Sequence, residues 1–319
     1  MNVQLLLENL TNPALLFFVL GILAVTFRSD LQIPPNSSKF ISLYLLFSIG
    51  FKGGQELAHE SFSFEIVWSI LFGLAASFLI PVYTYFILRN RFSVYDSGAI
   101  AAAYGSISAV TFVTATTYLE AHQLTLQGHM VAVMALMEAP AIISGLLLIN
   151  FFSGNGYQQF SKRKAVCHSL TNGSVFLIIG SLVIGLLASE EQAQGIKPFT
   201  TDIFKGFLAI FLLDMGIESG RNLKSLFSFG WFPILFSVFI PLINGCLFAY
   251  LSGFITPDVS NRFIFAILTA SASYIAVPAA MKVSVPQANP GLYLPMALAI
   301  TFPINITIGM PLYYAIVNQ

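Results

Sequence analysis

The chain has 319 residues, of which 56% are hydrophobic and only 9% are charged, and its formal net charge is zero. A soluble domain has about 25% charged residues, so this composition excludes an ordinary soluble protein. The zero net charge gives no electrostatic support for nucleic-acid binding.

Long uncharged stretches recur along the chain and predict membrane-spanning helices, each of which needs about 20 apolar residues. A transmembrane barrel would instead require alternating strands of about 10 residues. In chain order we expect ten spans, at residues 13–27, 38–51, 63–88, 97–118, 127–152, 174–188, 203–217, 228–254, 262–281 and 291–317. The predicted fold class is therefore an all-α integral membrane protein with ten transmembrane helices.

The order of short and long spans is the same in residues 1–152 and 174–319, which predicts an internal five-helix repeat. Five is an odd number, so the second repeat is inverted relative to the first, as in secondary transporters. Matching residues, at offsets of 160 to 166, include Gly50 with Gly216, Pro81 with Pro241, Ser106 with Ser271, Ser108 with Ser273, Met134 with Met296 and Pro140 with Pro303. Residues 153–173 are predicted to be the linker between the repeats.

The loops after the odd-numbered spans hold ten Lys and Arg residues, and the other loops hold four. Positive charge is enriched in cytoplasmic loops, so this asymmetry predicts a cytoplasmic linker at 153–173 and both termini outside.

The fourth and ninth spans each carry a Ser-x-Ser pair: Ser106 with Ser108, and Ser271 with Ser273. Residues two apart share a side only in an extended chain, so a common ligand would require both helices to be unwound there. Gly105 and Pro278 favour such breaks. Broken helices crossing near the midplane would direct two positive helix N-termini at one point and attract an anion.

Close helix packing is the alternative for these serines, with each hydroxyl bonded back to a carbonyl one turn earlier. No Lys or Arg lies in the middle of a predicted span. Anion binding would therefore depend on backbone amides and hydroxyls, which favours a small, singly charged substrate.

Two acidic residues, Glu138 and Asp214, lie deeper inside the predicted spans than the other acidic residues. Carboxylates in a membrane are costly and mark ion or proton pathways, although each also has a structural alternative as a hydrogen-bonding group. Glu138 precedes a proline that frees backbone carbonyls, and its repeat partner region contains Thr301 and Asn305. These oxygen-bearing groups are predicted ligands of a hard cation such as Na⁺.

An enzyme is not predicted. Asp214 is the only aspartate inside a predicted span, so a pair of facing aspartates is absent, and no serine there has a His or Lys partner. The four histidines have no spacing typical of a metal site, and no cofactor is predicted.

The segment VPQANP at Val285–Pro290, the sequence MGIE at Met215–Glu218 and the two serine-rich breaks resemble the sodium-dependent bicarbonate transporter (SbtA-type) family, over essentially the whole chain. The resemblance implies two inverted five-helix repeats, a core domain and a gate domain, a homotrimer, and the plasma (inner) membrane of a bacterium. It also implies bicarbonate import coupled to Na⁺ by alternating access, and a PII-like regulatory protein as a candidate cytoplasmic partner.

Carried over by position, the resemblance adds substrate and ion ligands to the residues named above. The implied substrate site consists of Gly105, Ser106, Ser108, Ala109, Ser271, Ser273, Tyr274 and Ile275. The predicted Na⁺ site consists of Ser108, Thr111 and Glu138, which match family positions, together with Thr301 and Asn305 from the repeat partner region. Both Tyr274 and Glu138 stand where the family has Asp. Glu138 keeps the carboxylate, whereas Tyr274 does not. Because one charge is then absent, a proton-coupled or uncoupled carrier of another small anion, such as a carboxylate, stays open as an alternative, as does a membrane sensor that does not transport.

Overall fold

The computed structural model describes residues 13–153 and 173–319, and within those ranges its regular structure is entirely helical. The helices are α2 (Pro13–Thr26), α3 (Pro35–His59), α4 (Phe64–Leu88), α5 (Val94–Gly105), α6 (Ala109–Ala121), α7 (Gly128–Phe152), α9 (Gly173–Leu187), α10 (Glu190–Lys197), α11 (Phe204–Phe227), α12 (Trp231–Leu251), α13 (Val259–Ala270), α14 (Ala276–Ser284), α15 (Pro290–Pro295), α16 (Phe302–Ile304) and α17 (Met310–Val317). Wider or tighter turns extend them at η1 (Pro198–Asp202), η2 (Ser252–Phe254), η3 (Met296–Thr301) and η4 (Asn305–Gly309). The predicted all-α class is confirmed for the described residues.

Five helical segments among the described residues are long and apolar enough to cross a membrane. They are Phe64–Leu88, Val94–Ala121, Gly128–Phe152, Trp231–Phe254 and Pro290–Val317. Three shorter apolar helices lie at Leu15–Thr26, Val175–Leu187 and Val259–Ala270. These lengths and compositions identify a helical membrane protein.

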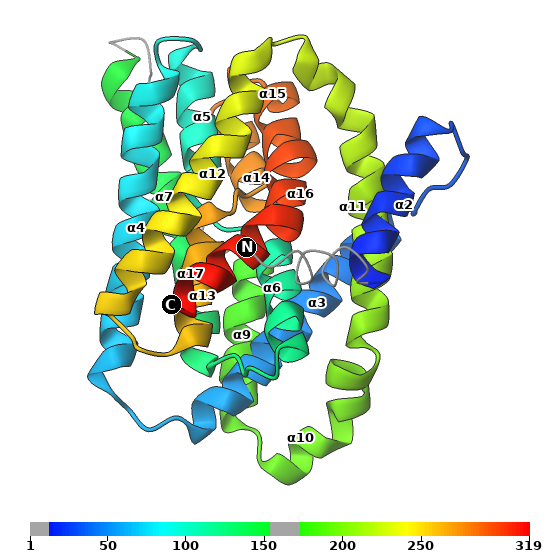
Figure 1. The fold of residues 1–319 in the computed structure, drawn as a ribbon, viewed down its shortest axis with the longest axis vertical. Coiled ribbons are helices and arrows are strands. Elements are labelled where there is room, and N and C mark those ends of the chain that lie inside the picture. Colours follow the sequence, from blue (N-terminus) through cyan, green and yellow to red (C-terminus); the bar gives the residue numbers. More distant parts are fainter. Residues whose placement is uncertain (1–12, 154–172) are drawn as a thin grey trace.

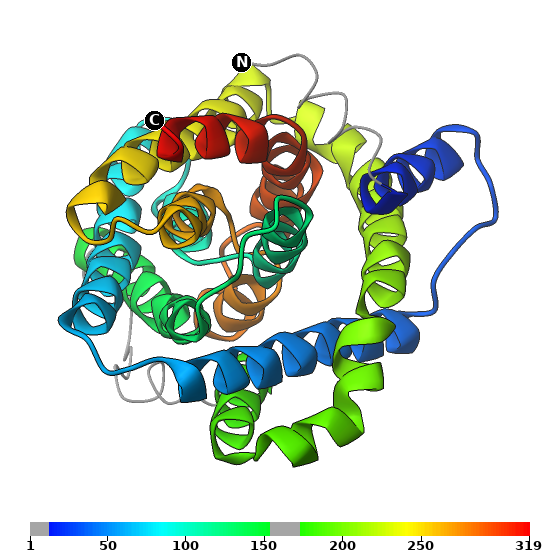
Figure 2. The same cartoon turned by 60° about the horizontal axis from the view of Figure 1, so that its bottom comes forward.

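A bundle and a flanking group of helices make up the molecule (Figure 1). In the bundle, α4 packs on α5 and α7, and α12 packs on α13 and α17. The flanking group consists of α2, α3, α9 and α11. It meets the bundle where α3 contacts α7 and where α11 contacts α15 and η3. Figure 2 shows α3 and α11 along two sides of the bundle, and α9 and α2 pack on them.

Two close helix crossings hold the flanking group together. In the α2–α11 crossing, a Cβ atom on Gly216 would lie 3.1 Å from the Cα of Gly21. In the α3–α9 crossing, a Cβ atom on Gly185 would lie 3.1 Å from the Cα of Gly54. Small residues allow such backbone approach, which strengthens packing between helices in lipid.

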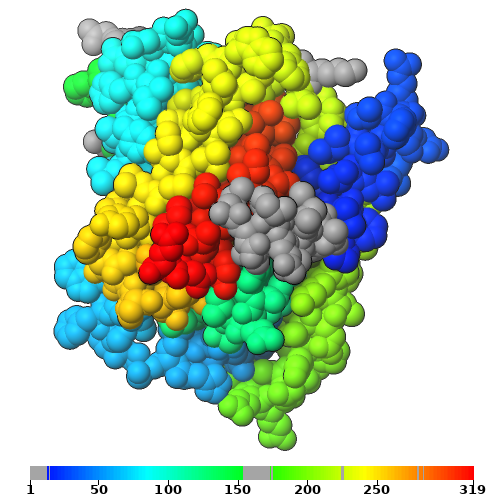
Figure 3. Space-filling view, in the orientation of Figure 1, coloured from blue at the N-terminus to red at the C-terminus, as the bar shows by residue number. Residues whose placement is uncertain are grey.

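An apolar stripe covers the outward side of α12, where Leu235, Phe239, Ile243 and Leu247 recur every four residues and are each about half exposed. Figure 3 shows this helix (yellow) running across one face of the molecule, beside α4 (cyan). Residues four apart lie on one side of a helix. An exposed stripe of this length suits contact with lipid rather than water.

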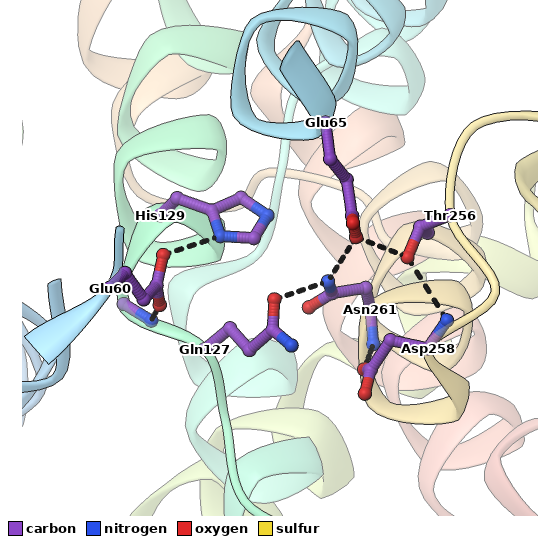
Figure 4. A network of polar contacts seen from close by, with 8 residues as sticks. Glu60, Glu65, Gln127, His129, Thr256, Asp258 and Asn261 are labelled. Carbon is purple, nitrogen blue, oxygen red and sulfur yellow. Dashed lines mark hydrogen bonds and ion pairs between the residues drawn. The ribbon is translucent and has the colours of Figure 1, made fainter. Parts of the chain in front are cut away.

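A polar network joins four elements near the end of α3 (Figure 4). Glu60, just after α3, accepts the Gly128 N–H at 2.5 Å and faces His129 Nδ1 at 2.9 Å. Glu65 of α4 accepts from Thr256 and, at 3.2 Å, from Asn261 Nδ2. The network therefore fixes the starts of α4, α7 and α13 relative to the end of α3.

Helix boundaries differ from the predicted spans in the flanking group. α3 and α11 extend beyond the predicted spans 38–51 and 203–217. The spans end where the first charged residues follow, whereas the helices continue past those residues. Residues 190–197 form α10, whose start has a capping box between Ser189 and Gln192. Most of the predicted linker 153–173 lies outside the described residues.

Candidate functional site

Two helices are broken at the predicted serine pairs. α5 ends at Gly105 and α6 begins at Ala109, while α13 ends at Ala270 and α14 begins at Ala276. Serine side chains compete with helical hydrogen bonds, and here the Ser108 hydroxyl accepts the Thr111 N–H at 3.1 Å as the N-cap of α6. The unwinding expected from the sequence is present in both segments.

The two breaks are hydrogen bonded to each other. The Ser273 N–H donates directly to the Ala103 carbonyl at 2.8 Å. The Ser108 N–H donates to the Ser271 hydroxyl at 3.0 Å, and this hydroxyl donates to the Leu268 carbonyl at 2.9 Å. Ala103 and Leu268, like Ser108 and Ser273, are separated by 165 residues. The two connections therefore correspond to each other. The one from Ser273 to Ala103 is direct, and the one from Ser108 to Leu268 passes through the Ser271 hydroxyl.

A small cavity of about 20 Å³ lies where the breaks meet. Its lining residues are Leu46, Ile107, Ser108, Ala109, Glu138, Ile178, Ser273, Tyr274, Ile275 and Ala276. Ala109 and Ala276 are the first residues of α6 and α14, so both helix N-termini border the cavity. The positive ends of the two helix dipoles favour an anion, and the Ser108 and Ser273 hydroxyls already accept the Thr111 and Val277 N–H groups there.

Two polar atoms of this lining, Glu138 Oε1 and the Tyr274 hydroxyl, have no hydrogen bond of normal geometry to a described residue, and the polar group beside the Tyr274 hydroxyl is the Ser108 side chain. Glu138 is only 4% exposed and Tyr274 only 9%. An unpaired buried polar group costs about 1–3 kcal/mol, and an unpaired charge costs more. Both atoms are therefore available to hydrogen bond to a molecule that enters the cavity.

Five of the eight predicted substrate residues line this cavity, and three do not. Gly105 packs against the Pro81 ring, which a Cβ atom would overlap. Ser106 is fully buried with an unpartnered hydroxyl, and Ser271 serves as the relay between the breaks. These three residues shape the broken segments from behind the cavity.

The predicted cation ligands are not gathered in one place. Ser108 and Glu138 line the cavity, whereas Thr111, which is buried, does not. Thr301 Oγ1 donates to the Ser237 carbonyl at 2.8 Å, and Asn305 Nδ2 donates to the Ala270 carbonyl at 2.7 Å. Thr301 and Asn305 thus connect helices. The described residues also contain no group of three or more His, Cys, Asp and Glu side chains that could hold a metal ion.

A model of the Na⁺-dependent bicarbonate transporter superfamily matches residues 13–318. The chain belongs to this superfamily. Membership identifies a transport protein rather than an enzyme, and the resemblance seen in the sequence is confirmed. Among curated proteins, none matches the chain.

Leu46 of α3 and Ile178 of α9 also line the cavity of this superfamily member, although nothing in the sequence marked them. Both are apolar residues in apolar helices, so their position depends on how the flanking group packs against the bundle. They place two helices of the flanking group against the broken helices of the bundle, so movement between the groups would change access to the cavity.

Proposed function

We propose that this chain is a secondary transporter that imports bicarbonate, or a similar small monoanion, together with Na⁺ by alternating access. The observation that carries the proposal is the cavity where two helix N-termini and the unpaired Tyr274 hydroxyl meet. The positive helix ends supply the attraction for an anion, and the hydroxyl supplies a hydrogen bond. A substrate without a large apolar part suits the small volume.

The proposed architecture is ten transmembrane helices in two inverted repeats, at 1–152 and 174–319, with residues 153–173 as a cytoplasmic linker. The paired hydrogen bonds between the breaks support it, as does the matching geometry of the α2–α11 and α3–α9 crossings. The proposed location is the inner membrane of a bacterium with both termini outside, from the distribution of Lys and Arg. A homotrimer and a PII-like regulatory partner belong to the proposal through the superfamily alone.

Glu138 is the proposed partner of the coupling ion. Its buried carboxylate borders the anion site, so a cation there would neutralise it and lie beside the substrate. Oxygen ligands suit Na⁺, and Ser108 is the other predicted Na⁺ ligand in the cavity lining.

A carrier coupled to protons, or to no ion, is the second candidate. Thr301 and Asn305 bond to other helices, and a phenol stands at Tyr274, so few oxygens surround Glu138. A proton needs only the carboxylate itself.

Uptake of labelled bicarbonate into proteoliposomes tests the proposal. We expect uptake that depends on a Na⁺ gradient and falls at least about tenfold in Ser273→Ala, the loss of about 1.4 kcal/mol of binding. Ser77→Ala is the control, because the buried Ser77 hydroxyl bonds only within its own helix, to the Leu74 carbonyl. Uptake driven by a pH gradient alone would favour the second candidate. Binding without uptake would indicate a sensor. The absence of both binding and uptake would refute the proposal.

A further inference from the structure

A carboxylate on α6 bridges two lysines from the flanking group. Glu120 Oε1 lies 3.1 Å from Lys52 Nζ of α3, and Glu120 Oε2 lies 3.4 Å from Lys205 Nζ of α11. The three side chains are between 37% and 65% exposed, so solvent reaches all of them. Each carboxylate oxygen thus pairs with one ammonium group, and the two ammonium groups come from different helices.

This bridge borders a hollow of about 120 Å³ whose lining includes Ile49 and Lys52 of α3 and Thr116 and Glu120 of α6. It lies toward the end of the molecule that carries α10, where α6 ends and α11 begins (Figure 1). The hollow is therefore open to the solvent on the side that the proposed orientation makes external.

The same two helices line both the hollow and the cavity at the breaks. α3 gives Leu46 to the cavity and Ile49 to the hollow, one turn further along the same side of the helix. α6 gives Ala109 to the cavity and Thr116 and Glu120 to the hollow, at positions seven and eleven residues later on one side. The seam between α3 and α6 thus runs from the lysine pair to the candidate site.

The Glu120 carboxylate has the shape and charge of the proposed substrate class. It is planar and carries one negative charge shared by two oxygens, as bicarbonate and formate do. Ion pairs at such exposure contribute about 0–1 kcal/mol, so a dissolved anion can replace this carboxylate at little cost. Glu56 also lines the hollow, so with Glu120 displaced one carboxylate would be left there for the two lysines.

We propose that Lys52 and Lys205 form a capture site for a small planar monoanion at the outer end of the α3–α6 seam, and that Glu120 is an internal competitor for it. The identity of the anion and the direction of entry rest on the proposed function. The capture site itself rests on the geometry of the three side chains.

Uptake kinetics test this role. Lys52→Gln combined with Lys205→Gln should raise the bicarbonate concentration for half-maximal uptake at least about fivefold, equal to about 1 kcal/mol, and change the maximal rate less than about twofold. Glu120→Gln should lower that concentration, but have no effect in the double lysine variant, since the residues act as one unit. Lys39→Gln is the control, because Lys39 is exposed at the opposite end of α3. Unchanged half-saturation in the double lysine variant would overturn the proposal.

A measurement on purified protein separates this proposal from the proposed function. The rate at which an amine-acetylating reagent modifies each lysine is followed by mass spectrometry, with sodium formate or bicarbonate compared against sodium chloride. In Glu120→Gln, either oxyanion should slow modification of Lys52 and Lys205 at least about twofold relative to Lys39. A twofold effect requires only that the anion occupies the site half of the time. Protection without any uptake would support the capture site while refuting the transport function. Equal rates in all salts would refute the capture site.

Discussion

The Ser108 N–H and the Ser271 hydroxyl, hydrogen bonded at 3.0 Å, join two helices at the points where both are broken. The hydroxyl also donates to the Leu268 carbonyl at 2.9 Å, so it acts as a relay. The corresponding bond, from the Ser273 N–H to the Ala103 carbonyl, needs no relay. The Ser271 side chain therefore connects the Ser108 N–H to the Leu268 carbonyl, whereas the Ser273 N–H reaches the Ala103 carbonyl directly.

Ser271→Ala should destabilise the protein, because it leaves a buried N–H and a buried carbonyl without this partner. The expected cost is about 1–3 kcal/mol, or a fall of several degrees in the unfolding temperature measured in detergent. Ser252→Ala is a matched control: Ser252 is equally buried and donates to the Ala249 carbonyl at 3.1 Å, within its own chain segment. Equal falls for the two variants would mean that the relay contributes nothing beyond a local bond.

The breaks themselves could be predicted from the sequence, but the directions of their side chains could not. An extended Ser-x-Ser pair was expected to point both serines at one ligand. Ser106 and Ser271 instead close α5 and α13 as C-caps, and only Ser108 and Ser273 reach the cavity. The extended part is too short for simple alternation to hold, since each pair still belongs to the helix end beside it.

Contacts between distant helices were the other part that the sequence could not supply. Thr301 and Asn305 carry oxygen atoms near the predicted depth of Glu138, but their helix faces Ser237 and Ala270. Leu46 and Ile178 reach the cavity without any polar signal. Apolar length and composition predict where helices lie along the chain, whereas the face that each helix turns to a neighbour depends on packing.

Tyr274→Phe should weaken substrate binding without destabilising the fold, because the hydroxyl it removes has no hydrogen bond of normal geometry to a described residue. We expect the concentration for half-maximal uptake to rise about tenfold, the equivalent of one hydrogen bond. The matched control is Tyr313→Phe, since the buried Tyr313 hydroxyl donates to Asn305 Oδ1 at 3.0 Å. That variant should lose stability, and a Tyr274→Phe protein that transports normally would remove Tyr274 from the site.

Glu138→Gln should strongly reduce ion-dependent uptake and leave the fold intact. The substitution keeps the size of the side chain and removes a buried charge that has no cationic partner among residues 13–153 and 173–319, so it should not lower the unfolding temperature. Uptake by the variant, measured with and without a Na⁺ gradient, should fall at least about tenfold. Asp214→Asn is the control, because Asp214 is bonded to Ser38 away from the cavity. If Asp214→Asn and not Glu138→Gln changed the ion dependence, the coupling site would lie between α3 and α11.

Glu60 gives the fold a dependence on acid pH. Burial alone would raise its pKa, but hydrogen bonds from His129 and the Gly128 N–H hold the pKa of this carboxyl below its usual 4.5. A lowered pKa stabilises the folded state above that value, and the stabilisation is lost as the pH falls through the folded-state pKa.

We therefore expect the unfolding temperature of the wild type to fall more steeply below about pH 4.5 than that of Glu60→Gln, with the two differing by a few degrees at neutral pH. Glu190→Gln is the control, because the His59–Glu190 pair is separated by 3.6 Å and both side chains are at least 60% exposed. Exposed pairs contribute little, so this variant should follow the wild type at every pH. Parallel curves for the wild type and Glu60→Gln would show that the Glu60–His129 contact, at 2.9 Å, does not stabilise the junction of α3 and α7.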